Sequence, residues 1–210
     1  MRIIEQSHQI LYPVDRLAWL REVSLIELAG RTAYKSEDKI TIDSHRSFIK
    51  MIIERNHLAV IEFGSMAVKF ITDRGITHEL VRHRLCSFLQ ESTRYCNYGK
   101  DKFGNEVSFI MPSGLNDLQR QCWEYSCKKA EEQYLELLLM GNTPQQARAV
   151  LPNCLKTEII VKANFREWRH IFQLRAISKA AHPDMRRLMI PLYEECRQQC
   201  PEVFNMGDVE

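Results

Sequence analysis

Residues 82–94 of the chain read RHRLCSFLQESTR and place three arginines, and no lysine, within thirteen residues. A guanidinium can bind a planar or anionic group through two parallel N–H donors, which an ammonium cannot do. If residues 88–95 are extended, Gln90, Ser92 and Arg94 alternate onto one face. They then offer an amide, a hydroxyl and a guanidinium in a row, which suits a base carbonyl and a phosphate. A solvated basic turn explains the same spacing equally well.

Arg82 and Arg84 pose a geometric question. On a helix two such residues point about 200° apart, so they should not hold one ligand group together. Either they contact two ligands, or one of them faces a neighbouring subunit. The chain has no Gly-x-Gly-x-x-Gly after a strand and no Gly-Lys-Ser/Thr, so a bound nucleotide would have to be held by side chains.

A second cluster occupies residues 164–175. Trp168, Ile171 and Phe172 form an apolar stripe at positions i, i+3 and i+4, and position i+7 of that stripe is Arg175. An arginine buried without a partner is strongly unfavourable, so Arg175 needs a carboxylate or an anionic or carbonyl-rich ligand. A structural ion pair is the simpler alternative. Arg148, on a short helix before Pro152, either converges on the same pocket or is exposed.

The overall charge excludes some classes of protein and conceals a local imbalance. The 210 residues carry 29 Lys plus Arg and 27 Asp plus Glu, a net charge of +2, with 45% hydrophobic residues. This is an ordinary globular composition, and the length favours one domain over residues 1–210. Residues 82–94 contribute +2 and residues 148–175 contribute +4, so the rest of the chain is −4. A basic site within an acidic body is therefore expected.

The cysteines and the apolar segments indicate a cellular location. No apolar run approaches the roughly 18–20 residues that span a bilayer, and residues 1–8 lack the apolar region of a signal peptide. The seven cysteines form no Cys-x-x-Cys pair. Reduced thiols in the cytoplasm are expected, with no metal site.

Hydrophobic periodicity and capping residues predict an α+β fold, with a small sheet packed by long helices. Helices are expected at residues 15–35, 43–55, 75–84 with Thr77 as the cap, 115–140, from Thr143-Pro144 onward, 166–176 and 184–199. Strands are expected at residues 62–72, 106–111 and 154–163, with an extended segment at 87–95.

The arginine run also fits a longer pattern: Arg-His-Arg, seven residues, Ser, any residue, Arg. This pattern resembles the signature of the flavin-dependent thymidylate synthases, the ThyX family. Three further segments are similar to family segments in the same order, and the resemblance extends from about residue 20 to residue 200. They are Asn56-His57 ahead of Glu62-Phe63, residues 147–153, and residues 164–175.

The resemblance implies reductive methylation of dUMP to dTMP. The methylene group would come from methylenetetrahydrofolate, and the hydride from NADPH through bound FAD. It also implies a homotetramer in which several subunits build each site, which is consistent with Arg82 and Arg84 pointing apart.

The resemblance assigns roles to individual residues. Those expected to bind FAD are His57, Ala59, Glu62, Arg82, His83, Arg84, Gln90, Asn164, Phe165, Arg166 and His170. Those expected to bind dUMP are Glu79, Leu80, Val81, Arg82, Gln90, Glu91, Ser92, Thr93, Arg94, Arg148 and Arg175, with Arg94 and Arg148 on the phosphate. Arg175 is the expected catalytic residue, because a permanent positive charge in a low-dielectric pocket stabilises negative charge on the uracil ring.

Some positions depart from the family pattern or suggest other chemistry. Ala59, Glu79 and His170 stand where some family members place threonine, glutamine and asparagine. Cys154, in Leu-Pro-Asn-Cys, resembles the nucleophile of classical thymidylate synthases, but no His follows it, and we predict a packing role. Ser92 has no evident general base, so a hydrogen bond to the nucleotide is its simpler role.

Two other classes of function remain open from the sequence. One is an RNA- or DNA-binding module that stacks bases on Phe88, Tyr95 and Tyr98. The net charge of +2 and the pI of about 8.1 argue against it. The other is a catalytically silent homologue with a role in assembly.

Overall fold

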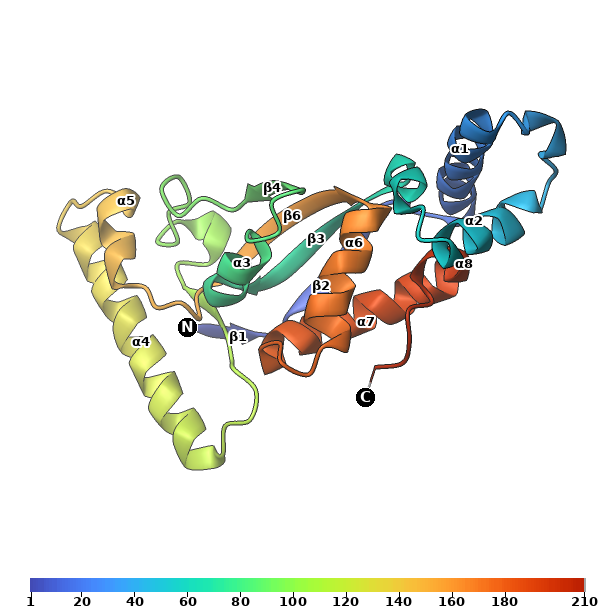
Figure 1. The fold of residues 1–210 in the computed structure, drawn as a ribbon. Coiled ribbons are helices and arrows are strands. Elements are labelled where there is room, and N and C mark those ends of the chain that lie inside the picture. The colour runs from blue at the N-terminus through green and yellow to red at the C-terminus, as the bar shows by residue number, and fades with distance from the viewer. Residues whose placement is uncertain (210) are drawn as a thin grey trace. The chain divides into compact units, whose positions relative to one another are not determined.

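The computed structural model describes residues 1–209 and has the expected mixture of helices and strands (Figure 1). The strands are β1 (Arg2–Ile4), β2 (Ser7–Tyr12), β3 (Ser65–Asp73), β4 (Ser87–Gln90), β5 (Ser108–Ile110) and β6 (Lys156–Asn164). The helices are α1 (Arg16–Tyr34), α2 (Ser44–Glu54), α3 (Arg74–Leu80), α4 (Asp117–Leu139), α5 (Pro144–Ala147), α6 (Phe165–Phe172), α7 (Pro183–Gln199) and α8 (Pro201–Phe204).

Four strands form one sheet in the order β2-β3-β6-β4, and β1 pairs with β5 in parallel. The central strands β3 and β6 lie side by side in Figure 1 and alternate between buried and half-exposed residues. Met66, Val68 and Phe70 point to the buried face of β3, and Ile159 and Val161 to that of β6. The same alternation of apolar and polar residues in the sequence predicts both strands.

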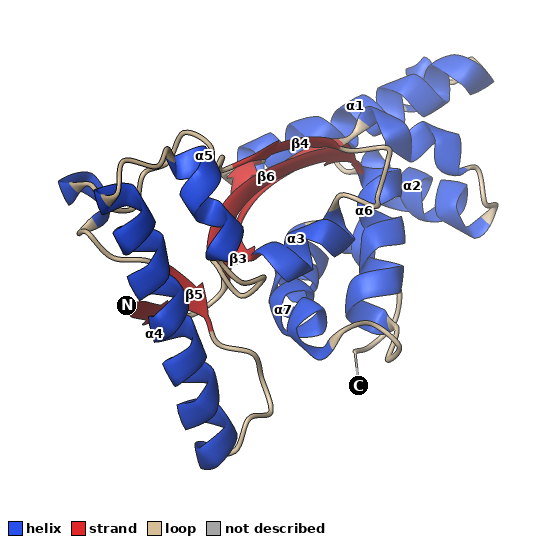
Figure 2. Cartoon of the chain, turned by 90° about the vertical axis from the view of Figure 1, so that its left-hand side faces the viewer, coloured by secondary structure: helices blue, strands red, loops and turns tan. Residues whose placement is uncertain are grey.

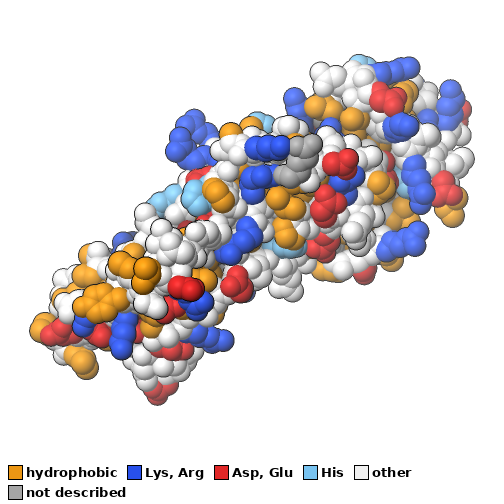
Figure 3. Space-filling model, turned by 90° about the horizontal axis from the view of Figure 1, so that it is seen from below, with side chains coloured by type: hydrophobic (Ala, Val, Ile, Leu, Met, Phe, Trp, Pro, Cys, Tyr) orange, Lys and Arg blue, Asp and Glu red, His pale blue; other side chains and the backbone are white. Residues whose placement is uncertain are grey.

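The chain divides into two compact units. The first unit comprises residues 1–7, 70–82 and 89–159, and the second comprises residues 8–69, 83–88 and 160 onward. Strands β3 and β6 contribute residues to both. Figure 3 shows one face of the molecule, on which basic side chains (blue) and acidic side chains (red) are intermixed. No helix within residues 1–209 is long and apolar enough to cross a membrane.

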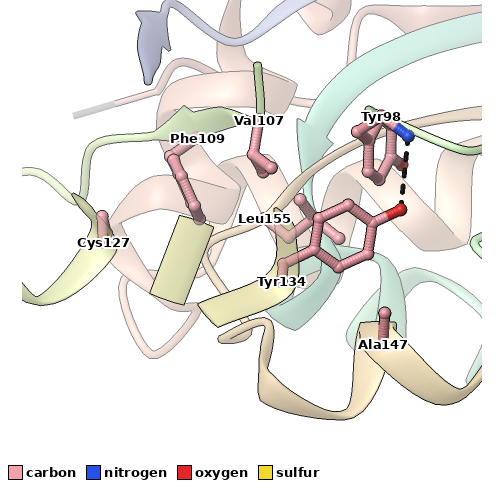
Figure 4. Packing of buried hydrophobic residues seen from close by; sticks show 7 residues of the cluster. All are labelled: Tyr98, Val107, Phe109, Cys127, Tyr134, Ala147 and Leu155. Atoms are coloured by element: carbon pink, nitrogen blue, oxygen red, sulfur yellow. Dashed lines mark hydrogen bonds between the residues drawn. The ribbon is translucent and has the colours of Figure 1, made fainter. Parts of the chain in front are cut away.

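The first unit is built around the long helix α4 (Figure 2). Asn116 and Gln119 form a reciprocal capping box at its start, and Gly141, with a φ of +90°, follows its end. Figure 4 shows the core that this helix covers, in which the Tyr134 hydroxyl accepts a hydrogen bond from the Tyr98 N–H at 3.2 Å. The core residues are Tyr98, Val107, Phe109, Cys127, Tyr134, Ala147 and Leu155.

The second unit is held together by aromatic packing. Trp19 stacks on Phe165 with ring centroids 5.7 Å apart, and Phe204 meets Phe165 edge-on at 5.2 Å. A Cβ atom added at Gly64 would lie 2.5 Å from the Phe165 ring, so only glycine permits this approach. The strand at residue 65 therefore packs directly on the start of α6.

Several predicted boundaries are wrong. The strand predicted from residue 62 begins at Ser65, because residues Leu58–Phe63 form a 3₁₀ helix. Helix α3 is capped by Asp73, whose Oδ1 accepts from the Ile76 N–H at 2.7 Å, and not by Thr77. It also ends at Leu80, four residues before the predicted end at Arg84. The 200° separation of Arg82 and Arg84 on a helix therefore does not apply.

The helix predicted over residues 166–176 changes its hydrogen bonding near its end. Helix α6 ends at Phe172, and Gln173–Ile177 form a π turn. The Ser178 N–H donates to the Gln173 carbonyl at 3.1 Å, which is the i→i+5 bond of a π turn. Arg175 is consequently half-buried, and not on the fully buried face that the α-helical period predicts.

Candidate functional site

The loop after β4 does not form the predicted row of side chains. Strand β4 ends at Gln90, whose amide Nε2 donates to the hydroxyls of Thr77 at 3.0 Å and Thr157 at 3.2 Å. The strand does not continue beyond Gln90 and residues 93–95 form a turn, so the extended row of Gln90, Ser92 and Arg94 is not formed. The Ser92 Oγ accepts a hydrogen bond from the Arg94 N–H at 3.3 Å. The prediction of an alternating amide, hydroxyl and guanidinium is therefore wrong.

The structure nevertheless brings together the two arginines expected to bind phosphate. Arg148 Nη1 donates to the Thr93 hydroxyl at 3.0 Å, and Arg94 Nε donates to the Gln145 side chain at 2.9 Å. Each arginine thus bonds to the segment that carries the other. The capping box of Thr143 and Gln146 fixes the start of α5 beside them, as the sequence predicts.

A cavity of about 300 Å³ lies beside this pair of segments within the first unit. Its lining residues are Arg74, His78, Thr93, Arg148, Ala149, Leu151, Pro152, Asn153 and Leu155. Arg74 Nη1 is buried and has no hydrogen-bond partner among residues 1–209. Two guanidinium groups in the wall of one cavity favour an anionic ligand.

Arg74 and His78 are absent from the predicted site. Neither belongs to a recognisable motif, and Arg74 stands alone between an aspartate and a glycine. The only available signal is the position of Arg74 between a predicted strand, which ends at residue 72, and a predicted helix, which begins at residue 75.

Glu91 is already engaged by two neighbours. It accepts a hydrogen bond from the Tyr98 hydroxyl at 2.8 Å and from Lys156 Nζ at 3.1 Å. Burial, with the nearby Glu91 carboxylate, raises the pKa of Tyr98, so that phenol stays protonated and donates. Its two partners hold this predicted nucleotide contact in place.

The predicted residues at the end of α3 differ in their exposure. Leu80 is buried, Glu79 is half-buried, and Val81 and Arg82 are exposed. The side chain of Leu80 belongs to the core, so only its backbone can reach a ligand. Thr93 is buried, and its hydroxyl accepts the hydrogen bond from Arg148.

In the second unit, a cluster of titratable groups surrounds His83. Arg175 Nε donates to His83 Nε2 at 3.2 Å, and Glu167 Oε1 lies 3.6 Å from His83 Nδ1. The His170 ring meets His83 edge-on with centroids 5.8 Å apart. Three of these residues, His83, His170 and Arg175, are in the predicted site, and Glu167 is not.

The His83 ring is neutral at physiological pH. Burial, together with the neighbouring Arg175 guanidinium and His170 ring, lowers its pKa from 6.5 to about 4. Burial also raises the pKa of Glu167, with His170 opposing that shift. Arg82 and Arg84, on either side of His83, are both exposed.

The other residues predicted to bind the flavin lie around the start of α6. Arg166 Nη1 pairs with Glu62 Oε1 at 2.6 Å, and the Asn164 side chain caps α6 by accepting from the Glu167 N–H at 2.9 Å. His57 Nδ1 lies 2.6 Å from the Tyr34 hydroxyl, and Ala59 is exposed on the 3₁₀ helix. Phe165 is fully buried in the aromatic core, so its side chain is not available to a cofactor.

Comparison with known proteins identifies the family. Residues 18–202 match the family described as thymidylate synthase complementing protein. The chain is 35% identical over 217 residues to a flavin-dependent thymidylate synthase of Corynebacterium efficiens, covering 94% of this chain and 86% of that protein. The chain belongs to the flavin-dependent thymidylate synthase family. A family member from Mycobacterium sp. (strain JLS) is 34% identical over 206 residues, covering 86% and 78% of the two chains.

A solved structure has the same fold. The UMP/dUMP methylase PolB from Streptomyces cacaoi, bound with 5-Br dUMP, aligns with a TM-score of 0.75 and 20% sequence identity. The alignment covers 98% of this chain and 96% of PolB. Membership of the family confirms the resemblance drawn from residues 82–94.

Proposed function

We propose that the chain catalyses the reductive methylation of dUMP to dTMP, with methylenetetrahydrofolate as carbon donor and NADPH as reductant through FAD. The observation that carries this proposal is the cavity of about 300 Å³ whose wall holds Arg148, Arg74 and Thr93. Guanidinium groups and a hydroxyl are the donors that a nucleotide monophosphate requires.

Arg148 and Arg94 would bind the phosphate of dUMP. Both guanidinium groups bond to uncharged oxygens, of Thr93 and Gln145, and a phosphate would replace these neutral acceptors with charged ones. Hydrogen bonds to ionised groups are about twice as strong as neutral ones. The exchange therefore favours the bound nucleotide.

Arg175 would act on the uracil ring. Its guanidinium is half-buried and oriented by the neutral ring of His83. A fixed positive charge of this kind stabilises negative charge that develops on the pyrimidine, and it needs no proton transfer of its own.

The residues of the second unit suit a flavin dinucleotide. Arg84 and Arg166 are exposed and can pair with its diphosphate. Glu62, on the 3₁₀ helix, and His57, just before that helix, offer polar contacts. The flavin, when bound, supplies hydride transfer. The protein's own residues need only bind and orient it and the nucleotide.

We further propose that residues 1–210 act as one domain within a cytoplasmic homotetramer. Large exposed apolar side chains support the association of subunits: Leu118, Leu139 and Met140 on or beside α4 are 70–89% exposed, and Leu85 and Leu89 are 76% and 74% exposed. Seven free cysteines are consistent with a reducing compartment.

The test is an assay of the purified protein with FAD. We expect a yellow protein that oxidises NADPH only when dUMP is present and transfers labelled carbon from methylenetetrahydrofolate to dTMP. A colourless protein that takes up no FAD would contradict the proposal, as would NADPH oxidation without dTMP. Steeply salt-dependent binding to oligonucleotides, without any response to dUMP, would indicate the nucleic-acid-binding alternative.

A further inference from the structure

Glu167 is a buried carboxylate to which neither the sequence nor the proposed function assigns a role. It is 8% exposed and follows Asn164 and Arg166 at the start of α6. Its Oε1 lies 3.6 Å from His83 Nδ1. Burial of the Cys86 thiol and, to a smaller extent, the charge of Glu167 raise the pKa of that thiol to about 12. A carboxylate buried at such a position is costly unless it interacts with a polar or charged neighbour.

The hydrogen bond between Arg175 and His83 determines where the imidazole proton is. A guanidinium can only donate, so His83 Nε2 must accept and carries no proton. The single proton of the neutral ring is therefore on Nδ1. Nδ1 is the ring atom that faces Glu167.

We propose that Glu167 is a positioning residue, whose carboxylate keeps the His83 proton on Nδ1 and so leaves Nε2 free to hold Arg175. In the other tautomer, an N–H of the ring would point at an N–H of the guanidinium and the bond would be lost. The orientation of Arg175 toward the uracil ring is the part of this inference that rests on the proposed function.

Another role for the same residues is binding a metal ion. One ligand atom each from His83, Glu167 and His170 lies within 4.8 Å of the others. A metal on His83 Nδ1 would shift the ring proton to Nε2, which could then no longer accept from Arg175. A metal on Nε2 would displace Arg175 directly. The observed hydrogen bond therefore favours the positioning role.

The first test measures the tautomer itself, by ¹⁵N NMR of protein labelled at histidine. The His83 signals are identified by their loss in His83→Asn. We expect the Nδ1–H form in the wild type and in Glu167→Gln, whose amide oxygen keeps a partial negative charge facing Nδ1, and a mixture of both forms in Glu167→Leu. An Nε2–H form in the wild type would overturn the proposal, as would an unchanged tautomer in Glu167→Leu. Shifts of the His83 signals on adding Zn²⁺ or Mn²⁺ would indicate a metal site instead.

The second test asks whether Glu167 acts through Arg175. We expect Glu167→Leu to lower kcat about tenfold in the presence of Arg175, and by less than about twofold when Arg175 is already Lys. Glu167→Gln should restore kcat to within about twofold. The exposed Glu54→Leu, in the same unit, is the matched control and should leave kcat unchanged.

The two tests separate failure of the inference from failure of the proposed function. Equal losses in both Arg175 backgrounds would mean that Glu167 has only a structural role. If the wild type forms no dTMP, the proposed function fails, and the tautomer measurement still decides the role of Glu167 toward His83.

Discussion

Arg148 in the first unit and Arg175 in the second are held in different ways. Arg148 donates to the hydroxyl of Thr93 and lines an open cavity together with Arg74. Arg175 donates to an imidazole nitrogen whose ring is buried beside the carboxylate of Glu167. A hydroxyl can rotate and exchange partners, whereas a ring in a buried cluster cannot.

This difference predicts that the two arginines contribute to different quantities. An arginine that bonds to a weak neutral partner can exchange it for an anion, and so contributes to the affinity for the substrate. An arginine that is fixed by an oriented acceptor holds its charge at one position, and so contributes to the rate of the reaction. Substitutions at the two sites should therefore change different kinetic constants.

The largest effect is expected from Arg175→Ala. Loss of a preorganised charge at the reacting ring should lower kcat about 10²–10³-fold, with flavin content nearly unchanged. Steady-state assays and the flavin absorbance of the purified variant measure the two quantities. Arg169→Ala is the comparison, because Arg169 bonds to the Val203 carbonyl and should affect stability more than rate. An aggregated Arg175→Ala protein would mean that Arg175 is structural.

Arg148→Gln should weaken dUMP binding about 10–100-fold and change kcat little, because a charge-assisted hydrogen bond to phosphate is lost. Calorimetric titration with dUMP and with deoxyuridine measures this, and deoxyuridine affinity should not change. The exposed Lys128→Gln on α4 is the control for a general loss of charge. An equal loss of affinity for deoxyuridine would show that Arg148 does not contact the phosphate.

A smaller effect is expected from the buried His83 on the pH dependence of protein stability. The folded His83 has a pKa of about 4 against 6.5 in the unfolded chain, so between these values the unfolded chain binds more protons. Acidification from pH 6.5 to 4 should therefore cost on the order of 2 kcal/mol of stability at this site. His83→Asn should remove that part of the pH dependence, measured by thermal unfolding. Parallel curves for wild type and variant would contradict the low pKa.

The smallest effect is expected from Cys154→Ser. The Cys154 Sγ lies 3.5 Å from the Cys127 Sγ, next to the core of the first unit, which is a packing position. Turnover should stay within about twofold of the wild type, since an isosteric change at a non-reacting side chain removes no transition-state contact. Loss of all turnover with FAD still bound would make Cys154 a nucleophile after all.

The sequence predicts most elements of the fold but not how several of them end. The long amphipathic pattern and Gly141 locate α4, and Thr143-Pro144-Gln146 locates α5, because these signals are local. Asp73 and Thr77 are both plausible caps, and the sequence does not show that β3 runs directly into α3. The extended segment at 87–95 fails for a similar reason: beyond Gln90 the Glu91 N–H still bonds to the Glu158 carbonyl, but the chain then turns.

In the candidate site, too, the residues with local sequence signals are the ones that the sequence predicts. Arg94, Arg148 and His83 belong to spaced motifs and are found from the sequence. Arg74 and Glu167 are isolated residues that become notable only through burial and through the partner they have or lack, and burial depends on packing between distant segments.

The π turn at residues 173–177 makes the contact between Arg175 and His83 sensitive to the number of residues in this segment. This turn holds one residue more than an α-helical turn, and Leu174 within it is 43% exposed. Deleting Leu174 would remove little buried surface but let the helix continue with α-helical bonds, which would turn Arg175 to another direction around the axis. Every functional side chain would remain in the protein, and the contact to His83 would be lost. Gain or loss of a single codon here is thus a route by which a relative with an intact set of site residues becomes inactive.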